Sequence, residues 1–90
     1  MKITIQSIKF DITEKLNEYI EKKVGKLERF TEADTAEVVL KVTKPQTANN
    51  KEVAINIDGL HAEKIADTFE DAIDGAIDAL KTQIEKKKNK

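Results

Sequence analysis

Basic side chains in one helical segment are the residues best placed for binding chemistry in this sequence. Read as a helix that advances about 100° per residue, residues 13–30 sort their basic side chains onto one arc, between an apolar arc and an arc of glutamates. The basic arc consists of Lys15, Lys22, Lys23, Lys26 and Arg29. Surface helices usually mix the two signs, because Glu and Lys one turn apart attract each other. The sorting therefore indicates a surface that contacts an anionic partner, with an ordinary solvated face as the alternative.

Residues for catalysis or metal binding are sparse. The chain has one histidine, His61, and no cysteine, so it cannot form a typical zinc site or a Cys-His pair, and its sequence shows no organised Ser, His and Asp constellation. The acidic residues suited to acid–base work or to a hard cation are Asp67, Glu70, Asp71, Asp74 and Asp78. They crowd the N-terminal half of a predicted helix, where the helix dipole favours negative charge without any site. We therefore predict a surface histidine, no enzyme activity, no metal and no cofactor.

Length and composition predict one small cytoplasmic domain. Ninety residues, 39% of them hydrophobic, are enough for a single thin core, so we expect residues 1–90 to form one domain. The first ten residues alternate apolar and polar side chains and lack the apolar run of a signal peptide. No segment is long and apolar enough to span a membrane. The absence of cysteine suits a reducing compartment.

The net charge of −1 conceals a gradient along the chain. Residues 81–90 contain five lysines and one glutamate, whereas residues 58–78 contain seven acidic residues and only Lys64. Proteins that bind nucleic acid non-specifically are usually basic overall. This chain would have to bind an anionic partner through a local patch.

Alternating apolar residues predict four strands. They cover residues 2–7, residues 36–43, a segment built on Val53, Ile55 and Ile57, and residues 60–66. Asp58-Gly59 is a strong signal for a tight turn between the last two strands. Residues 44–50, which include a proline, form the longest predicted loop.

Two helices complete the prediction, one over residues 13–30 and one beginning near residue 68. Thr13 is the expected N-cap of the first helix, with Asp11 as the alternative, and Asp67 or Thr68 caps the second. The apolar stripe of the second helix consists of Phe69, Ala72, Ile73, Ala76, Ile77, Leu80 and Ile84. We expect the lysine-rich end to fray from about residue 86.

The order of these elements predicts an α+β fold of type β-α-β-β-β-α. The first two strands are joined through a helix and can be parallel, whereas the later strands follow one another as hairpins. A four-stranded mixed sheet with two helices packed on one face buries every apolar face and stripe. The other face of the sheet is left largely to solvent.

The lysines at the end of the second helix extend the candidate binding surface. In the predicted fold the helices lie side by side, so the basic arc and Lys86, Lys87 and Lys88 can form one anion-binding surface. Aromatic residues for stacking on unpaired bases are scarce, which favours phosphate contacts to structured RNA. We expect Lys23, Lys26 and Arg29 to carry most of these contacts, with Lys86 second.

An ordered set of short motifs resembles the ribosome hibernation promoting factors and ribosome-associated translation inhibitors. The motifs are MKITIQ at the start, FDITEKLNEYIEKK and KLERF in residues 10–30, LHA in residues 60–62, and AID and LKTQIEK in the second helix. The likeness covers nearly the whole chain and ends with the second helix. The sequence therefore resembles the short form of the family, which lacks the additional C-terminal domain that long forms use to pair ribosomes.

The resemblance implies the same fold and a function. It implies binding to ribosomal RNA of the small subunit, in the channel for messenger and transfer RNA, which silences idle ribosomes in stationary phase. It implies neither DNA nor a membrane as partner, and we expect a monomer when the protein is free. The family's basic positions match Lys23, Lys26, Arg29 and Lys86, whereas Ala79 and Thr82 stand where the family usually has basic residues. A protein-interaction module of the same fold that has lost RNA binding is the alternative.

Overall fold

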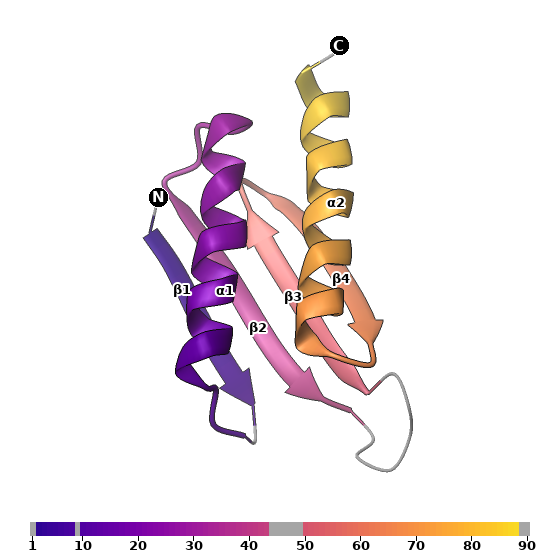
Figure 1. Ribbon diagram of the computed structural model, residues 1–90. Helices are drawn as coiled ribbons and strands as arrows, with labels where there is room; N and C mark the ends of the chain where they lie inside the picture. The colour runs from indigo at the N-terminus through magenta and orange to yellow at the C-terminus, as the bar shows by residue number, and fades with distance from the viewer. Residues whose placement is uncertain (1, 9, 44–49, 89–90) are drawn as a thin grey trace.

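The computed structural model describes residues 2–8, 10–43 and 50–88 and has the predicted β-α-β-β-β-α order. Its elements are β1 (Lys2–Ile8), α1 (Glu14–Gly25), the 3-10 helix η1 (Lys26–Arg29), β2 (Thr35–Val42), β3 (Lys51–Ile57), β4 (Leu60–Ala66) and α2 (Phe69–Lys88). Both helices lie on one face of a four-stranded sheet and run in the same direction (Figure 1). The predicted α+β architecture is confirmed. Of the predicted loop 44–50, only Asn50 lies within the described residues.

The sheet has the strand order β1-β2-β3-β4, with β1 and β2 parallel and the remaining pairs antiparallel. One row of paired residues crosses all four strands, in the order Ile5, Val38, Ile55 and Ala62. Val38, Ile55 and Ala62 are buried and Ile5 packs at the edge of the core. This row lies under the helices because successive side chains of a strand alternate between the two faces.

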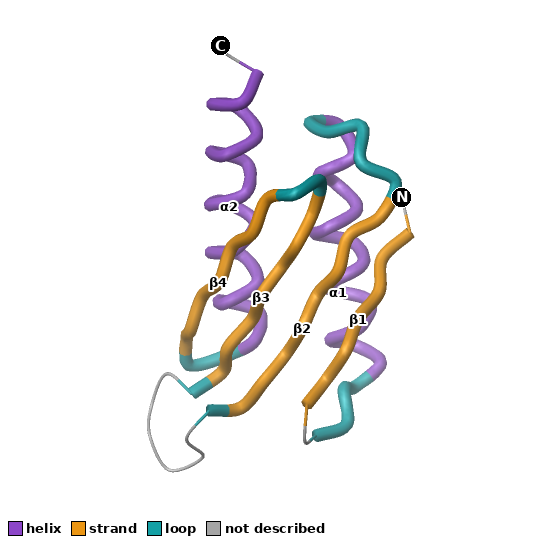
Figure 2. The backbone as a smooth tube through the Cα atoms, turned by 180° about the vertical axis from the view of Figure 1, so that it is seen from behind, coloured by secondary structure: helices purple, strands orange, loops and turns teal. Residues whose placement is uncertain are grey.

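The opposite face of the sheet is free of helices (Figure 2). The residues on this face are mostly polar. Its central row runs through Thr4, Glu37, Asn56 and His61. His61 is exposed, as predicted, and its Nδ1 contacts Oδ1 of Asn56. The two faces therefore separate a packed helical side from a solvated strand side.

The core is one layer between the sheet and the two helices. Ile20, Val24 and Leu27 enter it from α1 and η1, and Ile73 and Leu80 enter it from α2. The remaining α2 residues of the predicted apolar stripe are buried as well. Phe10 stacks on Phe69 with ring centroids 5.0 Å apart, which closes the edge of the core. Among the described residues, no helix is both long and apolar enough to cross a membrane.

The helix caps and the tight turn follow local sequence signals. Oγ1 of Thr13 accepts a hydrogen bond from the Leu16 amide at 3.2 Å, and Oγ1 of Thr68 accepts one from the Asp71 amide at 3.1 Å. Thr13 rather than Asp11 is thus the first N-cap. Asp58 and Gly59 have φ values of 52° and 75°, the left-handed pair that a two-residue hairpin turn requires.

The first helix differs from its prediction near its end. The α-helical hydrogen bonding stops at Gly25, and residues 26–29 continue as the tighter η1. Glycine is a poor helix former, so the α-helix is weakest at this residue. At the other end of the chain, α2 runs to Lys88, two residues beyond the position from which we expected fraying. The side chains of Lys87 and Lys88 lie outside the described part of the structure.

Candidate nucleic-acid interface

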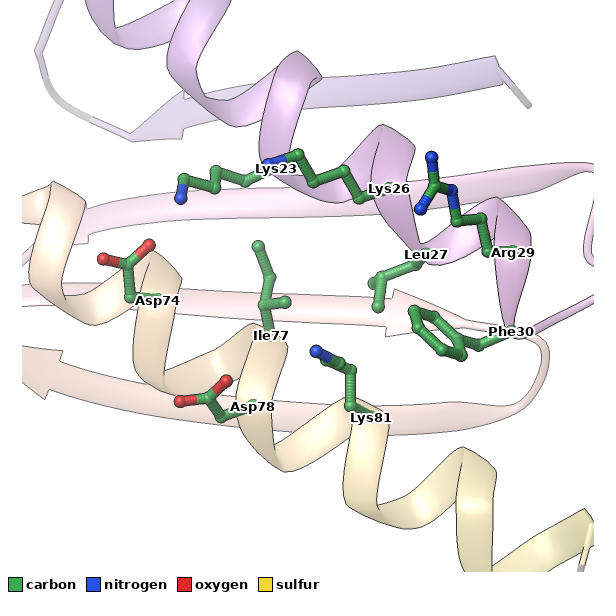
Figure 3. A pocket seen from close by; sticks show the side chains of 9 residues that line it. All are labelled: Lys23, Lys26, Leu27, Arg29, Phe30, Asp74, Ile77, Asp78 and Lys81. Carbon is green, nitrogen blue, oxygen red and sulfur yellow. The ribbon is translucent and has the colours of Figure 1, made fainter.

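A groove of about 610 Å³ lies between the two helices on the outer side of the molecule. Lys23, Lys26 and Arg29 line it from α1 and η1, and Asp74, Asp78 and Lys81 line it from α2 (Figure 3). Leu27, Phe30 and Ile77 form its apolar base. The groove therefore gathers three of the predicted binding residues in one place, with four cations in total.

The change from α1 to η1 aligns the basic wall of the groove. Residues three apart in a 3-10 helix lie directly above one another, so the tighter winding brings Lys26 and Arg29 into one row. Both side chains are exposed. Lys23, one turn earlier, is half-buried, as expected for a residue whose aliphatic stem lies at the edge of the core.

Lys81 is the binding candidate that sequence reasoning missed. It lies on the opposite wall, half-buried, with Nζ 5.3 Å from the centre of the Phe30 ring. The signal that could have identified it is the spacing of Asp74, Ile77, Asp78 and Lys81, which places these residues on one flank of α2. Lys86 is five residues further along, about 140° around the helix axis, and therefore points to another flank.

Beside the groove, Tyr19 of α1 contacts Asp74, one of the residues that line it. The Tyr19 hydroxyl donates a hydrogen bond to Oδ1 of Asp74 at 2.7 Å. This hydrogen bond, together with burial and the nearby carboxylates, raises the pKa of Tyr19 from 10.0 to about 12. The ammonium of Lys23 lies 5.5 Å from the centre of the same ring. Tyr19 thus joins α1 to α2 beside the groove.

The charges in the groove are close but not paired with each other. Within the described residues, no Lys or Arg of the groove makes an ion pair with Asp74 or Asp78. Lys23 and Lys81 instead lie over aromatic rings, and their charges remain accessible to a ligand. The arrangement is chemically suited to phosphate groups, which need several cations that are not already neutralised.

The other predicted residues do not share this groove. Lys15 and Lys22 line a second hollow of about 560 Å³ further toward the start of α1, together with Tyr19 and Glu70. Lys86 is exposed on α2 beyond the groove. The predicted single surface is therefore divided into a groove, a neighbouring hollow and a separate lysine. In the part of the chain that the structure describes, no group of His, Asp or Glu side chains is arranged to hold a metal ion.

Comparison with known proteins identifies relatives over the full chain. The family model of the sigma 54 modulation protein / S30EA ribosomal protein matches residues 3–90. The ribosome hibernation promoting factor of Escherichia coli K12 is 35% identical over 91 residues, which cover 100% of this chain and 96% of that protein. The factor of the same name from Klebsiella oxytoca is 31% identical with the same coverage.

Solved structures share the fold as well. The crystal structure of the Thermus thermophilus Protein Y N-terminal domain superposes with a TM-score of 0.78 and 29% identity, covering 96% of this chain and 98% of that one. A ribosomal subunit interface protein from Coxiella burnetii superposes with a TM-score of 0.80 and 26% identity, covering 100% of both chains. The family resemblance predicted from the sequence motifs is therefore confirmed.

Proposed function

The chain belongs to the sigma 54 modulation protein / S30EA ribosomal protein family, and on this basis we propose that it is a ribosome-associated hibernation factor. It binds ribosomal RNA of the small subunit, blocks the channel that messenger and transfer RNA use, and so silences idle ribosomes in stationary phase. It acts by occupying this channel rather than by catalysis. It works in the cytoplasm, where the ribosomes are, and is a monomer when free.

The observation that carries this proposal is the groove with four cations that form no ion pairs with its own carboxylates. We assign the main phosphate contacts to Lys23, Lys26 and Arg29, with Lys81 on the opposite wall. Phosphate contacts fix how a protein sits on RNA, and the surface of structured RNA presents phosphates at every step. Lys15, Lys22 and Lys86 are further contacts outside the groove.

Co-sedimentation with purified small ribosomal subunits over a salt series tests the proposal. The four phosphate contacts in the groove predict a contribution of about −3 to −4 to the slope of log affinity against log salt concentration, because each contact releases part of a condensed counterion. The parent protein is expected in the subunit fraction at about 50 mM salt and to be largely lost at about 200 mM. Absence from the subunit fraction at low salt would contradict the proposal.

A protein-interaction module is the second candidate, because Asp74 and Asp78 share the groove with the cations. A lining of both signs also suits a protein surface of mixed charge. The two functions differ in their salt response. Binding to a protein partner with a shallow salt dependence, and no binding to the subunit, would favour the interaction module.

A further inference from the structure

Tyr19 lies between a cation and a carboxylate that belong to opposite walls of the groove. Its hydroxyl donates to Oδ1 of Asp74 at 2.7 Å, and the Lys23 ammonium lies 5.5 Å from the centre of its ring. Figure 3 shows the Lys23 ammonium and the Asp74 carboxylate at the same end of the groove, Lys23 extending from α1 and Asp74 from α2. The hydroxyl thus engages the carboxylate nearest to this end of the basic wall.

A direct pair between Lys23 and Asp74 is the obvious competing arrangement. Opposite charges at a partly exposed site attract each other by a modest amount, which is enough to redirect flexible side chains. No such pair exists among the described residues, and the carboxylate accepts the phenol instead. The phenol keeps its proton throughout the neutral range, since even the ordinary tyrosine pKa of about 10 lies well above it, and so it remains a donor.

We propose that Tyr19 is a positioning residue that keeps Lys23 available to a phosphate by occupying the carboxylate of Asp74. The consequence for binding rests on the proposed contact of Lys23 with RNA, whereas the rearrangement of the pair does not. Loss of the hydroxyl frees Asp74, which then pairs with Lys23 and removes one cation from the basic wall. Tyr19 therefore acts on the ligand through Lys23 without contacting it.

Tyr19→Phe tests the proposal, because it keeps the ring under Lys23 and removes only the donor. We expect this variant to bind small subunits about threefold to tenfold more weakly, the size of one modest polar contact. The salt slope should become shallower by about one phosphate contact. Asp74→Asn keeps an acceptor for the phenol and removes the charge, so it should bind at least as tightly as the parent. Asp71→Asn removes one charge from the same helix outside the groove and measures the effect of net charge alone.

The decisive measurement is Tyr19→Phe in the background of Asp74→Asn. The proposal predicts that Tyr19→Phe no longer lowers the affinity in the Asp74→Asn background, because no charged carboxylate remains at position 74 to pair with Lys23. A role of the hydroxyl in packing alone predicts the same loss in both backgrounds, and that result would overturn the proposal. Thermal melts establish that all variants are compared in the folded state.

A crystal structure of the Tyr19→Phe variant decides the rearrangement without any ribosome. The proposal predicts that Nζ of Lys23 and a carboxylate oxygen of Asp74 lie within about 4 Å of each other. Lys23 still unpaired in that variant would overturn it. If the parent does not bind the subunit, the proposed function fails on its own, and this structure still decides what Tyr19 does.

Discussion

The Lys81 ammonium lies 5.3 Å from the centre of the Phe30 ring, which places a cation of α2 against the end of η1. The contact spans the groove, so one end of it is basic on both walls. A ring under an ammonium stabilises the charge without neutralising it. Lys81 is thereby held in one position and still presents its charge outward.

Reversing the charge of Lys81 is expected to weaken binding to the small ribosomal subunit more than reversing the charge of Lys86. Lys81→Glu removes a contact inside the groove and adds a repulsive charge there, so we expect a loss of affinity of more than about tenfold. Lys86→Glu makes the same charge change on another flank of α2 and should cost less than about threefold. Equilibrium binding to small subunits at one low salt concentration checks both. Equal losses would mean that net charge, rather than the groove, controls binding.

Charge reversal on the groove wall formed by α1 and η1 should abolish association with the ribosome. Lys26→Glu together with Arg29→Glu removes two charged contacts, for which we expect a loss of more than about 100-fold. Both side chains are exposed, so circular dichroism and the melting temperature should change little.

The matched control for this variant lies on the face of the sheet without helices. Lys2→Glu with Lys41→Glu makes the same change in net charge at two exposed strand positions. It should co-sediment almost like the parent. A folded Lys26, Arg29 variant that still co-sediments with the subunit would refute the assignment of the groove.

Substitution by alanine at two glycines is expected to change the free energy of unfolding in opposite directions. Gly25 has helical φ and ψ, and a Cβ atom there meets nothing within 4 Å, so Gly25→Ala should raise the free energy of unfolding by about 0.5–1 kcal/mol. Gly59 has a φ of 75° in the hairpin turn, so Gly59→Ala should lower it by about 1–2 kcal/mol. Urea denaturation measures both. A stabilised Gly59→Ala variant would contradict the left-handed turn.

The fold was predictable from the sequence because its signals are local. Alternation in the strands, the caps at Thr13 and Thr68, and the Asp58-Gly59 turn each depend on neighbouring residues alone, and all four strands and both helices are found where expected to within a few residues. The change to η1 was missed. Apolar spacing barely distinguishes an α-helix from one turn of 3-10 helix, since both place residues three or four apart on one side.

The site was only partly predictable, because it depends on how the two helices are rotated against each other. The sorted charges located Lys23, Lys26 and Arg29, which share one side of a single segment. Which flank of α2 faces them is set by packing on the sheet, and no local signal in the sequence measures this rotation. Lys81 and Asp74 were therefore missed as partners of this wall, and Lys86 was grouped with it.

The ionisation of Tyr19 offers a test of the Asp74 contact that needs no ligand. The hydrogen bond to Asp74 is the main cause of the rise in the pKa of Tyr19 from 10.0 to about 12. Tyr19 is the only tyrosine in the chain, so the near-ultraviolet absorbance of phenolate reports on this residue alone. We expect a midpoint near pH 12 in the folded parent, and a lower midpoint in Asp74→Asn because the charge is gone.

The same shift predicts how stability depends on pH. The pKa is raised in the folded state, so the stabilisation by the neutral phenol is fully present below pH 10 and is lost as the pH rises from 10 through 12. The loss should be on the order of 1–3 kcal/mol, because each unit of pKa shift corresponds to about 1.4 kcal/mol and contact with water lowers the contribution. Urea denaturation at a series of pH values measures it, and Tyr19→Phe, which cannot ionise here, corrects for the lysines that titrate in the same range. A parent and a variant that lose the same stability between pH 10 and 12 would show that the phenol does not donate to Asp74 in solution.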